Sequence, residues 1–167
     1  MVALKHGAVA LVVAAAAFAG WSGYSWYAAS HAASLTYGVA RDDALSSGRT
    51  LVAELSSLDY HDVNGGLDRW LSASTGPLHD QLARTDDTTK KTLAANATVA
   101  TGRVLDAALS ELDEHAGTAK MLASVEITMA KEGTAPAVKR NRFAAALSRT
   151  ADGWKLSALD QLPVGAR

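Results

Sequence analysis

The stretch from Ala119 to Ala130, AKMLASVEITMA, decides the fold because its residues alternate between two chemically different sets. Successive side chains of a β-strand point to opposite faces of a sheet, so this alternation predicts a strand with one buried face. The remainder of the domain is therefore expected to be built around a sheet. The buried set is predicted to be Ala119, Met121, Ala123, Val125, Ile127 and Met129.

Further strands are predicted on both sides of this one. Residues 98–112 are rich in Val, Thr and Leu, and an irregular phase near Val104 and Leu105 indicates a β-bulge. From Val138 to Arg149 two distinct faces return, and Asp152-Gly153 predicts a hairpin turn into a last strand. Strands that follow each other through short turns predict an antiparallel sheet. Alternate positions of the last strand are held by Trp154, Leu156, Ala158 and Leu162.

Helices are expected before the sheet. From Tyr37 to Leu58, apolar residues recur at spacings of three, four or seven, which is typical of an amphipathic helix. Asp62 is a fair N-cap for a short second helix that continues through Leu71. Helices followed by strands predict an α+β fold, in which the helices pack on one face of a curved antiparallel sheet.

A third helix is predicted to begin at Thr75-Gly76-Pro77, since Pro is favoured at the first helical position, and to run to about Asn96. Within it, Asp86 stands four residues before Lys90, which is the favourable order for a charge pair on a helix. The sequence therefore predicts one continuous helix whose surface this pair stabilises.

A different kind of segment precedes the domain. Residues 7–29 read GAVALVVAAAAFAGWSGYSWYAA and contain no charged side chain. A helix of about 20 mostly apolar residues is long enough to span the core of a bilayer. We therefore expect a single transmembrane anchor in contact with membrane lipid. Aromatic residues at its far end are typical of an interfacial belt, and they are Trp21, Tyr24, Trp26 and Tyr27.

The flanking charges predict how this anchor is oriented. Lys5 and the α-amino group lie before it, whereas the next charge after it, Arg41, is followed by two aspartates. The positive-inside rule then places the N-terminus in the cytoplasm and the bulk of the chain outside it, at the plasma membrane. The expected organisation is a cytoplasmic lead (1–6), the anchor (7–29), a linker (30–36) and an extracytoplasmic domain (37–167).

Two alternatives to a retained anchor stay open. Ala17-Phe18-Ala19 fits a small-residue cleavage site, so the segment could be a signal peptide that is removed. Against cleavage, the region before the apolar run is only weakly basic, and the aromatic cluster would be left at an exposed new N-terminus. The other alternative is a buried helix of a soluble protein.

Composition argues against several functional classes. The chain has 16 Lys and Arg against 17 Asp and Glu, so it lacks the basic excess of a nucleic-acid binder. It has no cysteine, which excludes a disulfide framework and a thiolate metal site. The histidines show no pair at metal-ligand spacing, and no glycine-rich phosphate loop is present. We expect no cofactor, no metal and no nucleic acid. The histidines are His6, His31, His61, His79 and His115.

The order of several short motifs along the chain resembles that of the actinobacterial Mce-associated membrane proteins, where Mce stands for mammalian cell entry. The motifs are Arg41 to Ala44 (RDDA), Asp59-Tyr60, the short helix with Leu67 and Leu71, Thr75 to Leu78 (TGPL) and Asp152 to Leu156 (DGWKL).

This resemblance implies a single-pass anchor that carries an extracytoplasmic cone of the nuclear-transport-factor-2-like (NTF2-like) fold. It also implies a role as an accessory or stabilising subunit of Mce lipid-import transporters, with Mce proteins as partners. The family supplies no agreed catalytic residues, so no enzymatic activity is expected. Cone folds of this type often dimerise through the sheet, which leaves a homodimer open.

The same cone fold also hosts isomerase-like enzymes, so fold alone does not decide function. Such an enzyme needs a carboxylate or histidine base that faces an apolar cup. The candidates are His61, Asp62 and Asp106, together with Tyr60. The simpler interpretation is that Tyr60 packs under the sheet and Asp62 caps the next helix, while Asp106 would act only if it were buried.

Binding is the remaining hypothesis for this domain. An apolar ligand could lie against Met121, Val125, Ile127, Phe143 and Leu147, and the candidates for lining a cup or contacting a partner are Tyr60, Trp70, Phe143 and Trp154. A basic cluster on one strand either discourages edge pairing or contacts anionic lipid headgroups or an acidic partner. Its members are Lys139, Arg140 and Arg142.

Overall fold

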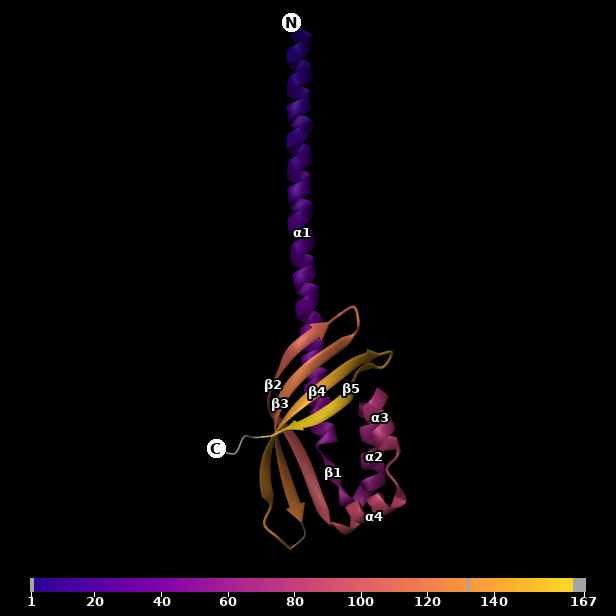
Figure 1. Ribbon diagram of the computed structural model, residues 1–167. Coiled ribbons are helices and arrows are strands. Elements are labelled where there is room, and N and C mark those ends of the chain that lie inside the picture. Colours follow the sequence, from indigo (N-terminus) through magenta and orange to yellow (C-terminus); the bar gives the residue numbers. More distant parts are fainter. Residues whose placement is uncertain (1, 132, 164–167) are drawn as a thin grey trace. The chain divides into compact units, whose positions relative to one another are not determined.

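The computed structural model describes residues 2–131 and 133–163, and within these it describes only the backbone of residues 2–17 and 28–34. The chain divides into two compact units, residues 1–40 and residues 41–167, and the first element, α1 (Val2–Leu55), contributes to both. The elements that follow are β1 (Leu58–Asp59), the single 3-10 turn η1 (Tyr60–Asp62), α2 (Val63–Ala73), α3 (Gly76–Ala83), α4 (Asp87–Ala95), β2 (Thr98–Asp113), β3 (Thr118–Lys131), β4 (Ala137–Thr150) and β5 (Gly153–Leu162) (Figure 1).

The second unit is built on one five-stranded antiparallel sheet whose strands lie in sequence order, β1-β2-β3-β4-β5. Its long strands twist and curve, and α2, α3 and α4 lie together beside it (Figure 1). Short turns join β2 to β3, β3 to β4 and β4 to β5, as expected for antiparallel neighbours, whereas η1 and the three short helices lie between β1 and β2 in the chain. The predicted α+β class, with helices packed on a curved antiparallel sheet, is confirmed.

The core lies between the sheet and the part of α1 that belongs to the second unit. Met121 and Val125 on β3 and Leu147 on β4 are buried there, as the alternation predicts. Ala44 and Val52 of α1 meet them with no exposed surface. A larger set of half-buried side chains packs around this centre, including Leu45, Leu51, Leu55, Leu109, Phe143 and Leu159.

A glycine sets how closely α1 approaches the sheet. A Cβ placed on Gly48 would lie 2.9 Å from Sδ of Met121 and 3.2 Å from Cδ2 of Leu147. Gly48 stands four residues after Ala44 and four before Val52, so small side chains line the stripe of α1 that faces the strands. The helix can therefore lie almost against the side chains of β3 and β4.

One side-chain hydrogen bond joins α1 to the last hairpin. The indole Nε1 of Trp154 donates to Oδ2 of Asp43 at 3.1 Å, and Trp154 is only 7% exposed. Nearby, the backbone N–H of Thr75 donates to the carbonyl of Leu156 at 2.8 Å, which joins the start of α3 to β5. Three of the short sequence motifs, RDDA, TGPL and DGWKL, therefore meet in one place.

A second tryptophan secures the C-terminal end of α1. Nε1 of Trp70, on α2, donates to the carbonyls of Glu54 and Ser57, both at 3.0 Å. The last carbonyls of a helix lack partners inside the helix, and the Trp70 indole supplies a donor there; the Glu54 carbonyl also accepts the N–H of Ser57 at 3.0 Å. Arg69 adds an ion pair to the Glu54 carboxylate at 3.0 Å.

The bulge predicted near Val104 and Leu105 is confirmed, because the β2–β3 register shifts between Val104 and Asp106. The β2–β3 register shifts again between Leu109 and Glu111, and a third shift, which the sequence does not signal, lies between β4 and β5. There Ala146 pairs with Ala158 but Leu147 pairs with Leu156, so Ser157 is an extra residue. The prediction that Ala158 and Leu162 share a face with Trp154 and Leu156 is therefore wrong, and Leu159 packs against the core instead.

The single helix predicted from Pro77 to Asn96 is also wrong, since the structure has two helices, α3 and α4, there. Oδ1 of Asp86 accepts the N–H of Thr89 at 2.8 Å and caps α4. Hydrogen bonding from Thr89 lowers the pKa of the Asp86 carboxyl. The Asp86–Lys90 pair does not form, and Lys90 lies 3.8 Å from Asp87 instead.

Two smaller expectations about the first helix also change. It ends at Leu55 instead of Leu58, and Leu58 begins β1, where it pairs with Ala100 of β2. The segment 30–36, expected as a linker, has a helical backbone.

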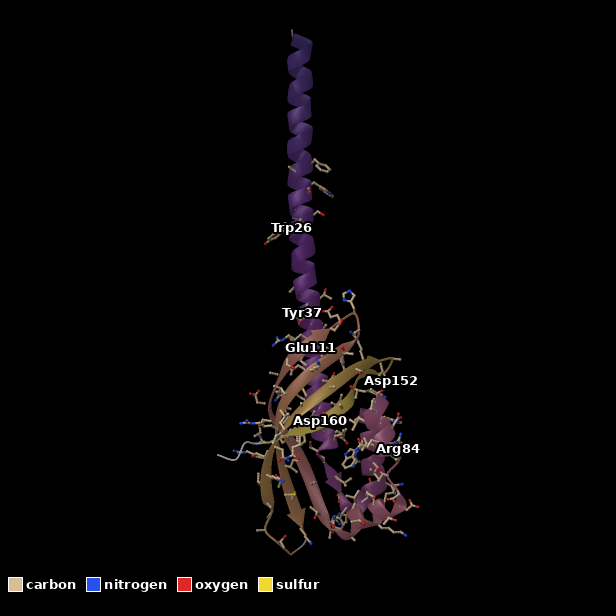
Figure 2. The ribbon with its side chains drawn as sticks, in the orientation of Figure 1. Trp26, Tyr37, Arg84, Glu111, Asp152 and Asp160 are labelled. Carbon is tan, nitrogen blue, oxygen red and sulfur yellow. The ribbon has the colours of Figure 1, made fainter. Side chains whose placement is uncertain are left out.

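In the first unit, the aromatic side chains at positions 21, 24, 26 and 27 are between 60% and 78% exposed, and Trp26 is labelled in Figure 2. Within the described residues, no helix combines the length and the apolar character needed to cross a membrane. The side chains of 7–17, 28 and 29, which make up much of the predicted anchor, lie outside the described set. The anchor and its orientation stay predictions.

The close approach at Gly48 gives a first prediction. Gly48→Leu should lower the free energy of unfolding by about 1–3 kcal/mol, because the new side chain would overlap Met121 and Leu147. Urea denaturation followed by circular dichroism measures it. Gly38→Leu is the matched control, since nothing lies within 4 Å of a Cβ there. Equal stability of the Gly48 and Gly38 variants would contradict the tight contact.

The Asp43–Trp154 hydrogen bond gives a second prediction. A double-mutant cycle with Asp43→Ala and Trp154→Phe should give a coupling free energy of about 1 kcal/mol, because both single variants remove the same bond. The cycle that pairs Trp154→Phe with Asp42→Ala should give a coupling near zero, since Asp42 forms its ion pair with Arg41. Similar couplings in the two cycles would show that the bond contributes nothing specific.

Candidate interaction surface

The side of the sheet that faces away from the core, here called the helix-free face, carries the other set of alternating side chains. Lys120, Leu122, Ser124 and Glu126 supply it on β3, and the strand registers give their neighbours. Figure 2 labels two members, Glu111 on β2 and Asp160 on β5. The remaining neighbours are Arg103, Asp106 and Ala108 on β2, Arg140, Arg142, Ala144 and Ala146 on β4, and Ala158 and Leu162 on β5.

A shallow hollow of about 360 Å³ lies on this face, over β2, β3, β4 and the end of β5. Leu122 stands in its wall and is 49% exposed, with Ala108 and Leu162 as further apolar lining. Asp106 and Arg142 bring one charge of each sign to the same hollow. An exposed apolar depression with charged residues at its margin is typical of a protein contact surface.

A charged cluster adjoins the hollow. The Glu126 carboxylate, only 17% exposed, accepts hydrogen bonds from Arg103 at 3.2 Å and from Arg140 at 3.0 Å. These bonds, first from Arg140 and then from Arg103, lower the pKa of Glu126. Glu126 therefore keeps its negative charge while two guanidinium groups surround it. The cluster has a net positive charge, and Arg142 follows in the next row.

The predicted basic cluster is divided between the two faces. Lys139 pairs with Ile127 across the β3–β4 ladder, whereas Arg140 pairs with Glu126 and Arg142 with Ser124. Since successive residues point to opposite faces, Lys139 points away from the helix-free face that carries both arginines. The pairing of β5 with β4 ends at Leu162 opposite Arg142, so the start of β4 is a sheet edge.

The four aromatic candidates do not line a common cup. Trp154 belongs to the core beside Asp43, and Trp70 lies against the end of α1. The Tyr60 ring contacts the His61 ring, with 3.8 Å between the centroids. Phe143 packs against the core and also borders the hollow. Met121, Val125 and Leu147, proposed as ligand-facing, are buried against α1, so side chains fill the inner side of the sheet.

The acid–base candidates are also dispersed. Asp59, which the sequence does not single out as a base, accepts the N–H of His61 at 2.9 Å and contacts its Nδ1 at 2.7 Å. The backbone hydrogen bond from His61 is the largest cause that lowers the pKa of Asp59. Asp62 accepts the N–H of Gly65 at 3.0 Å, which confirms its predicted capping role. Asp106 is exposed and accepts the N–H of Ala107 at 2.9 Å. Among the described residues, His61 is exposed and Asp106 borders the open hollow, so neither lies inside an enclosed apolar cup.

Metal-ligating groups do not gather in the part of the chain that the structure describes, where no three His, Cys, Asp or Glu side chains could share an ion. His79 lies 3.9 Å from Asp80 on α3. The side chains of His6 and His31 lie outside the described residues.

Sequence reasoning missed the hollow itself. The available signal was Leu122, an apolar residue at a position of β3 where the alternation calls for a polar one. The sequence could not show that Leu162 joins Leu122 in this hollow. The bulge at Ser157, which has no signal in the sequence, moves Leu162 to the helix-free face.

The domain is an α+β sheet-and-helix fold of the kind found in VirB8-like proteins, as solved structures show. An IcmL-like type IV secretion system protein from Legionella pneumophila has a TM-score of 0.62 at 10% identity and covers 76% of this chain and 95% of its own. The periplasmic domain of DotI has a TM-score of 0.58 at 11% identity, with 72% and 93% covered. CagV, a VirB8 homolog from Helicobacter pylori, has a TM-score of 0.55 at 8% identity, and the match covers 72% of this chain and 96% of CagV.

The particular family comes from the sequence. The family model described as "Uncharacterized protein Rv1363c/MT1408-like" matches residues 3–163, and the chain belongs to this family. The search of curated proteins gives no match. At identities of 8–11% the solved structures show the fold alone, and the family description does not mention Mce proteins.

The Glu126 cluster gives a third prediction. The pKa of the Glu126 carboxyl is lower in the folded protein than in the unfolded chain. The ionised carboxylate therefore contributes fully to folding stability above the unfolded pKa, about 4.3, and this contribution is lost as the pH falls through the folded pKa. Glu126→Gln should therefore be less stable than wild type at pH 7, with a difference that shrinks below about pH 4.3. Urea midpoints measured from pH 7 to pH 3 test this; a difference independent of pH would contradict it.

Proposed function

We propose that this chain is a non-enzymatic accessory subunit, anchored in the plasma membrane of an actinobacterial cell envelope, that binds and stabilises an Mce-type lipid importer. Its N-terminus lies in the cytoplasm and its domain lies outside. The helix-free face, with the hollow beside Leu122, is the docking surface. This face carries the proposal because it holds an exposed apolar hollow, while the inner side of the sheet is filled by side chains.

The composition of the helix-free face supports docking to another protein. Leu122 offers apolar area that water contacts in the isolated chain, so covering it is favourable. Arg103, Arg140 and Arg142 adjoin this area, and arginine is enriched in protein interfaces. Their charges can set the orientation of a partner with an acidic rim, since complementary charges give specificity more than affinity.

The sequence of residues 7–29 supports the envelope location. It has the length and apolar character of an anchor, and exposed aromatic side chains lie at its far end. The fold gives an analogy: one solved structure of similar fold is the periplasmic domain of DotI, and another is a type IV secretion system protein. By that analogy the domain serves in a multi-protein envelope assembly.

The Mce association rests on the order of the sequence motifs. RDDA, TGPL and DGWKL meet around Trp154 and Leu156, where they hold α1, α3 and β5 together. These motifs therefore report how the domain is folded, and the partner protein has to be identified by experiment. A non-enzymatic role is supported by the exposed positions of His61 and Asp106, which leave neither as a base inside an apolar cup.

A ligand-binding role has less support. The inner strand faces, on which that hypothesis depends, are covered by Ala44 and Val52 of α1. The hollow is an apolar site that the hypothesis could use instead, and it is open to one side of the sheet. A native mass measurement that finds lipid bound to the domain would favour this second role.

The docking surface gives a fourth prediction. Leu122→Glu should abolish co-purification of transporter components with the full chain in mild detergent, because it places a charge in the apolar hollow. The domain should stay folded, since Leu122 lies outside the core. Ala94→Glu on α4 is the matched control and should retain the partner, because it adds the same charge at an exposed site elsewhere.

The proposal fails if no transporter component accompanies the wild-type chain and transporter levels are unchanged in a deletion strain. If the transporter accompanies wild type and the Leu122 variant equally, the accessory role stands but the helix-free face is not the docking surface.

A further inference from the structure

We propose that the open edge of β4 binds an extended, acidic segment of a partner protein by strand addition. The open edge is the part of β4 from Ala137 to Asn141. It is a second surface, separate from the hollow, and the proposal does not depend on the Mce association. It requires backbone groups that are free to pair, side chains of suitable chemistry, and a reason why another copy of this chain does not occupy the site.

β4 is paired on one side over a longer span than on the other. Its ladder with β3 continues to Ala137, opposite Met129, whereas its ladder with β5 stops at Arg142, opposite Leu162. Pro163 follows Leu162, and its backbone is not part of a strand. The side of β4 next to β5 is therefore unpaired before Arg142 within the described residues.

The direction of the backbone groups can be worked out residue by residue. Arg149 donates its N–H to Gly117, on the β3 side, at 2.7 Å. Backbone groups of an antiparallel strand alternate in direction, and the β3–β4 register runs without a shift from Ser148 to Ala137. Counting back in steps of two, the odd-numbered residues of β4 face β3. Val138 and Arg140 therefore turn their N–H and C=O groups toward the open edge.

The side chains at this edge differ between the two faces of the sheet. Val138, which is 59% exposed, lies on the helix-free face, and Lys139 lies on the opposite face. The ion pairs among the described residues engage Arg103 and Arg140 with Glu126 and leave Lys139 and Arg142 without a carboxylate partner. An incoming strand that alternates acidic and apolar residues would place an acid opposite Lys139 and an apolar residue opposite Val138.

The charge at the edge selects the occupant. Two copies that paired through this edge would bring Lys139, Arg140 and Arg142 of each copy close together, and facing like charges are destabilising. The same charges attract an acidic strand. Peptides that add to an exposed edge gain affinity from main-chain hydrogen bonds and specificity from alternate side chains. The basic residues thus prevent self-association of the edge and favour an acidic partner.

The test titrates the full chain in mild detergent with a labelled peptide of alternating Glu and Val, and with a matched peptide of alternating Lys and Val. The acidic peptide should bind about tenfold tighter or better, and hydrogen exchange at the Val138 and Arg140 amides should slow on binding. Lys139→Glu should reverse the preference, whereas Lys91→Glu, the same charge change on α4, should leave it unchanged.

Val138→Pro tests the backbone part of the proposal. It removes an N–H that faces the open edge and takes no part in the β3–β4 ladder, so the domain should stay folded and lose the peptide. If circular dichroism shows that this variant unfolds, hydrogen exchange in the wild-type chain decides, and slowing away from the two edge amides overturns the proposal.

Three other outcomes would also overturn it. The first is equal binding of the acidic and basic peptides. The second is unchanged peptide binding by folded Val138→Pro. The third is a Lys139→Glu variant that keeps peptide binding and loses attachment to phosphatidylglycerol vesicles, because the edge charges would then serve a lipid surface.

Discussion

The closeness of α1 to the sheet is the constraint on which the rest of the domain depends. Gly48 allows the helix to touch Met121 and Leu147, and Ala44 and Val52 extend that contact along the same stripe. Interiors pack as densely as organic crystals, so a helix this close leaves no room between itself and the strands. The hydrogen bond from Trp154 to Asp43 and those from Trp70 to the end of α1 then hold the helix at both ends of this contact.

This packing decides where function can reside. Side chains of α1, β3 and β4 fill the inner side of the sheet, and among the described residues the acid–base candidates are capping groups or surface groups. Asp62 caps α2, and Asp106 bonds its neighbouring backbone. The chemistry that the sheet offers lies on its other side and along its free edge. A domain built in this way is suited to contacting other macromolecules.

The sequence predicted the features that depend on local pattern. Alternation in β3 identified the buried face, and the phase change at Val104 and Leu105 identified a bulge. Prediction from sequence failed where one residue could form either of two local structures. Asp86 lies within a helix-like pattern, but its carboxylate caps a new helix, which outweighs the expected charge pair with Lys90. Ser157 carries no pattern of its own, yet it reverses the face of every later residue in β5.

The candidate surface was harder to predict than the fold, because a surface requires knowing which face is left uncovered. The basic residues were visible in the sequence, but their division between two faces and the early end of β5 follow only from the registers. The aromatic residues were visible too, and two of them turned out to hold α1 in place.

The bond between Asp43 and Trp154 joins residues that are 111 positions apart. Loop-closure entropy makes such contacts slow to form, and proteins that depend on them fold more slowly than those with local contacts. The hairpins β2–β3, β3–β4 and β4–β5 close over much shorter distances. During synthesis α1 leaves the ribosome first, but its partner surface is complete only when β5 has been made. The apolar stripe of the segment from Arg41 to Leu55 therefore stays uncovered until β5 has been made, and the domain can complete its core only then.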